Sequence, residues 1–151
     1  MPKSKPPRKK VRTPSADRSK SNNIMNDLQT IDRECQNMLA ETAKFSPYLT
    51  NRELVEAGDM EQIHDNSKIL SRDTMQMKTE LDNIRASVPK RIHTDNPNHV
   101  MKGLSIGERY NEWQEKYQRA VLPTLERLGD LLKAAAENLG KKEEGKVDDN
   151  A

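Results

Sequence analysis

The fold is decided by residues 59–88, which read DMEQIHDNSKILSRDTMQMKTELDNIRASV. Nine positions in this stretch follow one another at alternating steps of three and four, the a and d spacing of a heptad helix. They are Met60, Ile63, Ser67, Leu70, Thr74, Met77, Leu81, Ile84 and Val88. Asp59 can cap the first turn with its carboxylate, and Pro89 steers the preceding residue out of the helical region. The spacing and both end signals therefore predict a helix over residues 60–88.

A seam as narrow as this one needs a partner helix. We expect the partner to contact the centre of the seam, at Leu70, Met77, Leu81 and Ile84. A second seam with the same steps lies earlier in the chain, at Ile24, Leu28, Ile31, Cys35, Met38, Thr42 and Phe45. Asn22 or Asn23 can cap its start, and Ser46 is followed by a proline, so a helix is predicted over residues 22–45. We expect the two long helices to run antiparallel as a hairpin.

A short helix is predicted between these two, over residues 51–57. Thr50 and Glu53, three residues apart, form a capping box for its start. Gly58 suits a left-handed position at its end.

A third long helix is predicted over residues 105–139. The residues before it hold two prolines and an Asp-Asn-Pro-Asn cluster without a period, which is typical of a loop. Ser105 and Glu108 form a capping box, and Gly140 can close the helix. Pro123 removes the bond to the carbonyl of residue 119 and is expected to kink the helix there, unless it splits the helix in two. The apolar face carries Tyr110, Trp113, Tyr117, Val121, Leu125, Leu128, Leu132, Ala135 and Leu139.

The predicted fold is all-α: an elongated helical hairpin plus a third long helix, in a coiled-coil-like three-helix bundle over residues 21–139. Residues 1–20 hold eight Lys and Arg against one Asp, a net charge of +7, and four prolines. Because the whole chain has a net charge of +2, the remaining residues carry −5. Segments 1–20 and 140–151 have too few apolar side chains to offset the entropy lost on ordering, so both are expected to be disordered tails.

The basic segment 1–20 carries the most informative functional signal. Lys9, Lys10 and Arg12 fit the Lys-Lys-x-Arg pattern of a nuclear import signal. The same charges would neutralise nucleic-acid phosphates and release counterions, and a third interpretation is a tail that only keeps the protein soluble. The candidate residues are Lys3, Lys5, Arg8, Lys9, Lys10 and Arg12.

Tyr110, Trp113 and Tyr117 hold three of the five aromatic residues of the chain on one stretch of helix. One interpretation is a hot spot that binds a partner protein, because Tyr and Trp combine a large area with a polar tip. The other, which we favour, is that the rings fill the wide end of the bundle opposite Phe45 or Met60.

Catalysis, metals and cofactors find little support in the sequence. The three histidines lack the spacing and acidic neighbours of a zinc site, and Cys35 occupies a seam position, where a thiol behaves as a small apolar group. We therefore expect no enzyme, no metal and no cofactor. There is no signal peptide and no apolar run of about 18 residues, so we expect no membrane contact and a soluble intracellular protein, nuclear if eukaryotic.

A basic disordered tail joined to a heptad hairpin resembles small helical subunits of nuclear or chromosome-associated assemblies, and also small virion or scaffolding proteins of viruses. We expect a non-enzymatic subunit that docks through its seams onto other helical proteins or onto copies of itself. Segment 1–20 would then serve nuclear import or nucleic-acid contact. The alternative is a nucleic-acid-binding or virion scaffold protein, without sequence specificity, in which segment 1–20 is the working part. The helices alone are expected to be marginally stable, with a partner covering Val121, Leu122 and Leu131.

Overall fold

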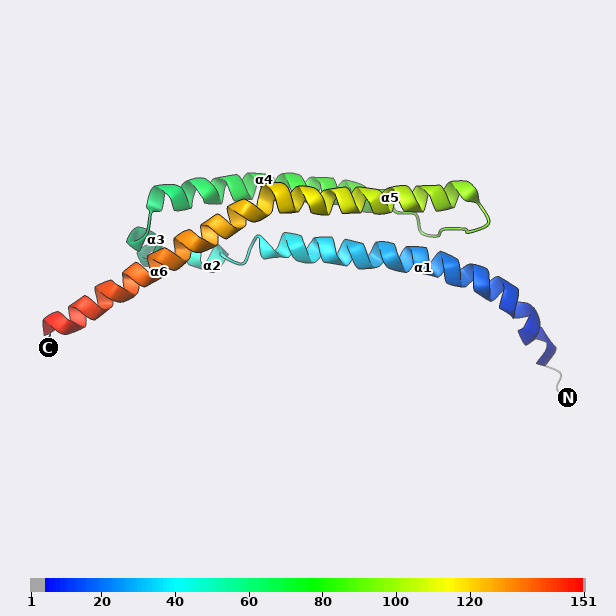
Figure 1. The fold of residues 1–151 in the computed structure, drawn as a ribbon, viewed down its shortest axis with the longest axis horizontal. Helices are drawn as coiled ribbons and strands as arrows, with labels where there is room; N and C mark the ends of the chain where they lie inside the picture. Colours follow the sequence, from blue (N-terminus) through cyan, green and yellow to red (C-terminus); the bar gives the residue numbers. More distant parts are fainter. Residues whose placement is uncertain (1–4, 151) are drawn as a thin grey trace.

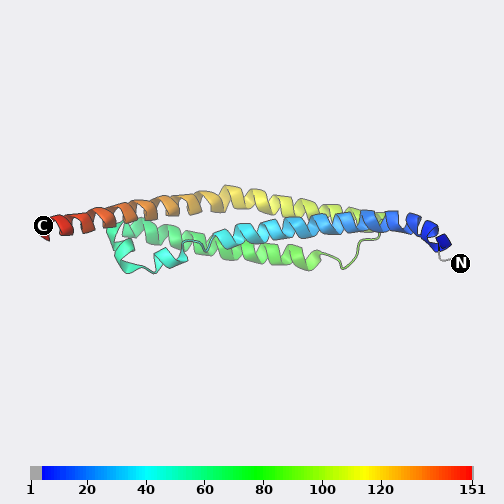
Figure 2. The same cartoon turned by 90° about the horizontal axis from the view of Figure 1, so that it is seen from below.

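The computed structural model describes the backbone of residues 5–150 and the side chains of residues 23–142. Within these limits the chain contains helices and no strand, which confirms the all-α prediction. The elements are α1 (Lys5–Glu41), α2 (Ser46–Leu49), α3 (Arg52–Ala57), α4 (Met60–Ser87), α5 (Pro97–Lys116), the π-helical turn η1 (Tyr117–Val121) and α6 (Leu122–Asn150). Figures 1 and 2 show three long segments side by side: α1, α4, and the continuous run of α5, η1 and α6. Since α4 runs antiparallel to the other two, the fold is an elongated three-helix bundle.

Helix α4 forms as its sequence predicts. The Asp59 carboxylate accepts a hydrogen bond from the backbone N–H of Gln62 at 3.1 Å, and Val88 is extended ahead of the proline. Five seam residues are at most 5% exposed: Ile63, Leu70, Met77, Leu81 and Ile84. Met60 is an exception, because it lies at the open end of the bundle and is 44% exposed.

The partner that this seam needs is supplied by the chain itself. The third segment buries its predicted face against α4 and α1, from Tyr110 through Leu128 to Ala135. The expectation that a second protein docks on Leu70, Met77, Leu81 and Ile84 is therefore wrong for this fold, because the four residues lie in the chain's own core. The three residues that a partner was expected to cover, Val121, Leu122 and Leu131, are not all exposed. Val121 is fully buried and Leu131 packs against the core, which leaves Leu122 at 36% exposure.

One buried polar residue of α4 lies outside the predicted seam. Asn66 is 4% exposed, and its amide donates to the carbonyl of Gln62 at 2.8 Å. Its side-chain oxygen accepts from Arg127 of α6 at 3.1 Å. Because both ends of the amide are paired, its burial does not leave an unsatisfied polar group.

The corner between α1 and α4 differs from the prediction. Helix α1 ends at Glu41 and not at residue 45, and it runs through Asn22 and Asn23, so neither of them caps it. Pro47 lies in the first turn of α2, where a missing N–H costs no helical hydrogen bond, so the proline starts a helix and does not simply end one.

The short helix α3 begins one residue from the expected capping box. Asn51 is its N-cap and accepts from the backbone N–H of Leu54 at 3.2 Å. The Thr50 hydroxyl instead donates back to the carbonyl of Pro47 at 3.0 Å. At the other end Gly58 is extended, with φ −108° and ψ −161°, and not left-handed.

Close packing explains why a glycine stands at position 58. A Cβ built there would lie 2.6 Å from the Cβ of Ala135, closer than such atoms approach in proteins. The absent side chain therefore lets the α3–α4 corner touch α6.

Helix α5 begins eight residues before the expected Ser105. Asn96 is its N-cap and accepts from the backbone N–H of Asn98 at 3.0 Å, while Pro97 occupies the first turn. The Asn-Pro pair that suggests a turn is thus a helix start, and the Ser105–Glu108 capping box is wrong, because both residues lie inside α5.

Pro123 is accommodated without splitting the helix. The backbone N–H of Leu122 bonds to the carbonyl of Tyr117, five residues earlier, so the hydrogen-bond ladder shifts by one residue just before the proline. Figure 1 shows the helix changing direction where α5 gives way to α6, as expected for a proline kink. The helix also continues through Gly140, so that glycine does not close it.

The two predicted tails lie mostly where the structure describes the backbone but not the side chains. Residues 1–4 and 151 are not described, and for residues 5–22 and 143–150 only the backbone is, within the bounds of α1 and α6. The expected disorder of segments 1–20 and 140–151 therefore stays a prediction.

Candidate functional site

The aromatic cluster of α5 and η1 is part of the core. Tyr110, Trp113 and Tyr117 are at most 3% exposed, and the last two rings stack with centroids 5.7 Å apart. The role of a hot spot for a partner is wrong for this fold, because the rings are covered by α1 and α4. Their expected neighbours were also misplaced: the Phe45 ring lies against Gly129, and Met60 is exposed.

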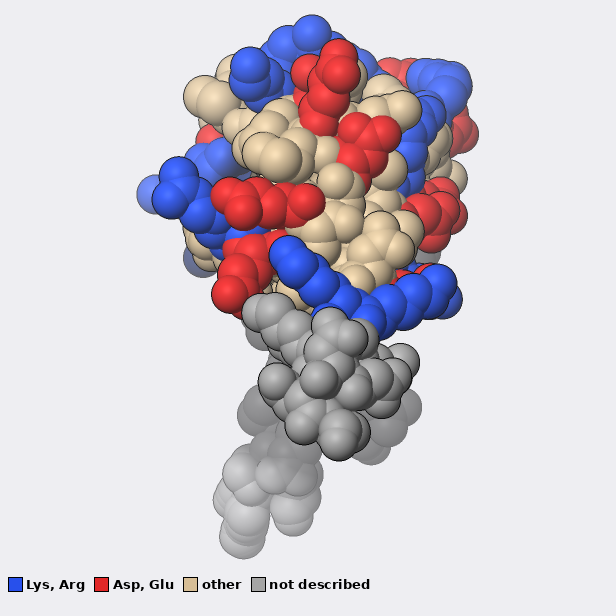
Figure 3. All heavy atoms as spheres, turned by 90° about the vertical axis from the view of Figure 1, so that its left-hand side faces the viewer, with Lys and Arg blue, Asp and Glu red and all other residues tan. Residues whose placement is uncertain are grey.

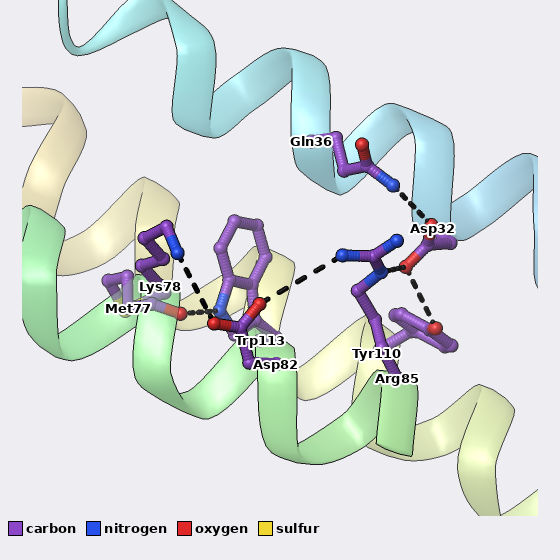
Figure 4. Close-up of polar contacts among 8 residues, drawn as sticks. All are labelled: Asp32, Gln36, Met77, Lys78, Asp82, Arg85, Tyr110 and Trp113. Carbon is purple, nitrogen blue, oxygen red and sulfur yellow. Dashed lines mark hydrogen bonds and ion pairs between the residues drawn. The ribbon is translucent and has the colours of Figure 1, made fainter. Parts of the chain in front are cut away.

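Each of the three aromatic side chains donates a hydrogen bond to another helix. Tyr110 Oη donates to Asp32 Oδ1 at 2.9 Å, and Tyr117 Oη donates to the carbonyl of Met38 at 2.6 Å. Trp113 Nε1 donates to the carbonyl of Met77 at 2.8 Å (Figure 4). The polar tips that could have met a partner are therefore used to join α5 and η1 to α1 and α4.

Asp32 of α1, which is partly exposed, contacts polar groups from three helices (Figure 4). Besides Tyr110 it accepts from Gln36 Nε2 at 2.5 Å and pairs with Arg85 Nε at 3.1 Å. Burial, and donation to this carboxylate, raise the pKa of Tyr110 well above its usual range, so the phenol remains a neutral donor. The Asp32 carboxylate accepts from three donors, and the Tyr110 phenol keeps its proton. This arrangement is better suited to joining helices than to acid–base chemistry.

Cys35 is a core residue, as its seam position predicts. It has no exposed surface, and burial raises the pKa of its thiol to about 11. At neutral pH such a thiol is almost entirely protonated, and it is therefore a poor nucleophile.

A hollow of about 250 Å³ lies between α4 and α5, lined by Glu80, Arg109, Trp113 and Lys116 among others. Its two cations already have partners. Lys116 Nζ pairs with Glu80 at 2.6 Å, and Arg109 donates to the Ser87 hydroxyl at 3.0 Å. This hollow is therefore a weak candidate for an anion site.

The end of the bundle formed by the α4–α5 loop is different in character. Three segments meet there at one apolar point: a Cβ built on Gly103 of α5 would lie 2.8 Å from Ile92 Cδ1 of the loop and 3.1 Å from Ile24 Cγ2 of α1. Ile92 is 1% exposed and anchors the loop in the core. We call this meeting of Ile24, Ile92 and Gly103 the end junction.

Three cations lie close in sequence to the end junction. All three are exposed: Arg91 directly precedes Ile92, Lys90 precedes Arg91, and Lys102 directly precedes Gly103. Ion pairs between residues of the described range 23–142 involve none of the three. Ile24 lies four residues after Lys20, the last cation of segment 1–20, so that segment leads into the same end of the bundle (Figure 1).

The opposite end, at α3, shows no comparable segregation of charge. Figure 3 looks onto this end, and Lys and Arg side chains are interspersed there with Asp and Glu around an uncharged centre. The excess positive charge that the sequence places in segment 1–20 therefore has no counterpart on the face shown in Figure 3.

The candidate residues of segment 1–20 lie outside the described side chains, so nothing tests their role: Lys3, Lys5, Arg8, Lys9, Lys10 and Arg12. Lys90, Arg91 and Lys102 were not among the candidate residues predicted from the sequence. The adjacent pair Lys90-Arg91 marks a local concentration of positive charge. The loop that contains it has no hydrophobic period, so the sequence does not indicate where in the fold this loop lies.

Among the described side chains, no group of three or more His, Cys, Asp or Glu is arranged to hold a metal ion. None of the helices in the described range is long and apolar enough to cross a membrane. The chain matches no protein-family model, and neither a curated protein nor a solved structure shows significant similarity to it.

Proposed function

We propose that this protein is a non-enzymatic nucleic-acid-binding protein whose working part is the basic segment 1–20, held at one end of a three-helix rod. The observation that carries the proposal is the segregation of charge. Segment 1–20 has a net charge of +7, while the remaining residues together carry −5. Cations concentrated in this way displace condensed counterions from a phosphate backbone, and this release drives binding.

The filled core of the bundle supports this function over docking through the seams. The seam residues of α4 and the aromatic cluster are buried within the chain, so they present little surface to another protein. The helical bundle is then the folded scaffold to which segment 1–20 is attached. Helix α1 runs from the core toward the end that carries this segment (Figure 1).

Binding of this kind does not read base sequence. Contacts from Lys and Arg to phosphates fix position and carry no sequence information directly. Segment 1–20 also contains no aromatic residue on which a base could stack.

The test is fluorescence anisotropy with labelled DNA duplexes of about 20 base pairs and two unrelated sequences. We expect micromolar affinity for both at physiological salt, equal within about threefold, and loss of binding when residues 1–20 are deleted. A full-length chain that binds neither duplex even at about 0.05 M salt would overturn the proposal.

A protein partner is the second candidate function, and one observation favours it. Met101 and Leu104 lie three residues apart on the outward side of α5 and are 66% and 55% exposed. The helical subunit expected from the sequence could use this pair as a contact, with Lys9, Lys10 and Arg12 as an import signal.

Substitution of the exposed pair tests this second function. Replacing Met101 and Leu104 by Ser should reduce the size of any complex seen by size-exclusion chromatography of a native extract. Met75→Ser is the control, since Met75 is 68% exposed and lies fifteen residues from Met60, the other exposed large apolar side chain of α4. Complexes of unchanged size in the double variant would exclude this surface.

A further inference from the structure

We infer that the α4–α5 loop and the first turns of α5 form a folded half of the nucleic-acid site, in which Lys90, Arg91 and Lys102 contact phosphates beside those held by segment 1–20. The inference rests on the proposed function and adds to it a second, structured set of phosphate contacts. The ligand class is a phosphodiester backbone, because three exposed cations spread over two segments suit an extended polyanion better than a small anion.

The end junction brings these cations to the place where segment 1–20 leads into the bundle. Ile92 and Gly103 hold the loop and α5 against Ile24. Arg91 is the neighbour of Ile92 in sequence, and Lys102 is the neighbour of Gly103. A phosphate backbone that follows segment 1–20 toward the bundle therefore reaches these two side chains next.

The loop is anchored at several points. Ile92 is buried, Asn96 caps α5, and the backbone N–H of His93 donates to His99 Nδ1 at 3.4 Å. The two imidazole rings also lie in contact, with centroids 5.2 Å apart. Cations on such a loop lose less conformational freedom on binding than cations on a mobile segment, which favours affinity.

The positive charge of the loop is available to a ligand. Residues 89–102 hold three Lys and Arg against Asp95 alone, a net charge of +2. No ion pair within residues 23–142 neutralises Lys90, Arg91 or Lys102, whereas Lys116 and Arg85 of the same bundle are paired.

The experiment compares two triple variants of the full-length chain with equal loss of charge. The first replaces Lys90, Arg91 and Lys102 by Gln. The matched control replaces Lys68, Lys133 and Lys141 by Gln. These three are also exposed, but they lie on α4 and α6, away from the end junction. Circular dichroism checks that both variants remain folded, and anisotropy with a duplex of about 20 base pairs gives the affinity as a function of salt.

We expect the loop variant to bind at least about tenfold more weakly than the wild type at about 0.1 M salt. The slope of log K against log salt concentration should become shallower by about 2–3, since each lost phosphate contact removes about 0.9. The control should change the affinity by less than about threefold.

The other outcomes are distinguishable. If the wild type binds and the two triple variants behave alike, the loop is no part of the site, and the proposed function stands with segment 1–20 alone. If the wild type does not bind nucleic acid at all, the proposed function and this inference both fail. Gly103→Ala adds a test without a change of charge, because its Cβ would lie 2.8 Å from Ile92 Cδ1 and 3.1 Å from Ile24 Cγ2, so both side chains must shift within the end junction. A folded Gly103→Ala chain with wild-type affinity would contradict the role of the anchored loop.

Discussion

The indole N–H of Trp113 donates to the backbone carbonyl of Met77 across 2.8 Å, in the buried contact between α5 and α4 (Figure 4). The two residues are 3% and 1% exposed, and both belong to faces that the heptad spacing predicts. This bond fixes the register of the two helices, because an indole has one donor and the carbonyl lies at a single height along α4. The bundle is thus joined by specific polar contacts as well as by apolar packing.

Replacing Trp113 by Phe tests the importance of this contact. The change removes the donor and leaves unfilled space beside the stacked Tyr117 ring, so the free energy of unfolding should fall by about 1–3 kcal/mol. Urea denaturation followed by circular dichroism measures the fall. The control is Met75→Ala on the exposed side of α4, which should stay within about 0.5 kcal/mol of the wild type. Equal effects of the two changes would contradict the observed packing.

Gly58→Ala should destabilise the protein by more than about 1 kcal/mol, because the new Cβ would lie 2.6 Å from Ala135 Cβ. The backbone at Gly58 is compatible with any residue, so the cost is purely steric. Ala135→Gly in the same chain should recover part of the loss, and a double-mutant cycle measures the coupling. Gly140→Ala is the control: nothing lies within 4 Å of its added Cβ, so it should be neutral or stabilising by up to about 1 kcal/mol. An uncoupled pair at positions 58 and 135 would contradict the close contact.

Cys35 should make stability depend on alkaline pH. Burial raises the pKa of this thiol from 9.0 to about 11, so above pH 9 the unfolded chain loses the proton first. The contribution of Cys35 to stability is therefore complete below pH 9 and declines as the pH rises toward 11, by at most about 2–3 kcal/mol.

Cys35→Ala isolates this contribution. The variant should be less stable at neutral pH because it leaves a small cavity, but the gap between it and the wild type should narrow between pH 8 and pH 11. Urea titrations at several pH values measure the gap. A gap that stays constant across this range would show that the thiol titrates normally in the folded chain.

Much of the bundle can be predicted from the sequence, because two of its signals are strong and local. The α4 seam from Ile63 to Ile84 and the long face from Tyr110 to Ala135 both follow helical spacing, and both are buried. What the spacing does not indicate is which faces meet. The seam of α4 was expected to meet the helix over residues 22–45 in a hairpin and also to dock onto partner helices, whereas the chain's own third segment covers it.

The missed features depend on contacts between residues far apart in sequence. Asn66 is a buried amide only because Arg127 reaches it from α6. Gly58 is required by Ala135, and a glycine before a helix gives no local sign of that neighbour. The start of α5 at Pro97 was missed for another reason: an Asn-Pro pair is compatible with both a turn and a capped helix, and the buried Ile92 favours the ordered form.

Because its seams are filled from within, the bundle should not need a partner for stability. The melting temperature should be the same, within about 2 °C, over roughly a hundredfold range of protein concentration. Differential scanning calorimetry or circular dichroism measures it. A melting temperature that rises steadily with concentration would restore the earlier expectation that association stabilises these helices.

The most direct test of the central claim is the salt dependence of duplex binding by the full-length chain. If six to eight cations of segment 1–20 meet phosphates, the slope of log K against log salt concentration should be about −5 to −7, and steeper with the three cations of the loop. The chain without residues 1–20 should show no measurable binding at physiological salt. A slope near zero, or binding that survives the deletion unchanged, would contradict the claim that this bundle holds a cationic end for nucleic acid.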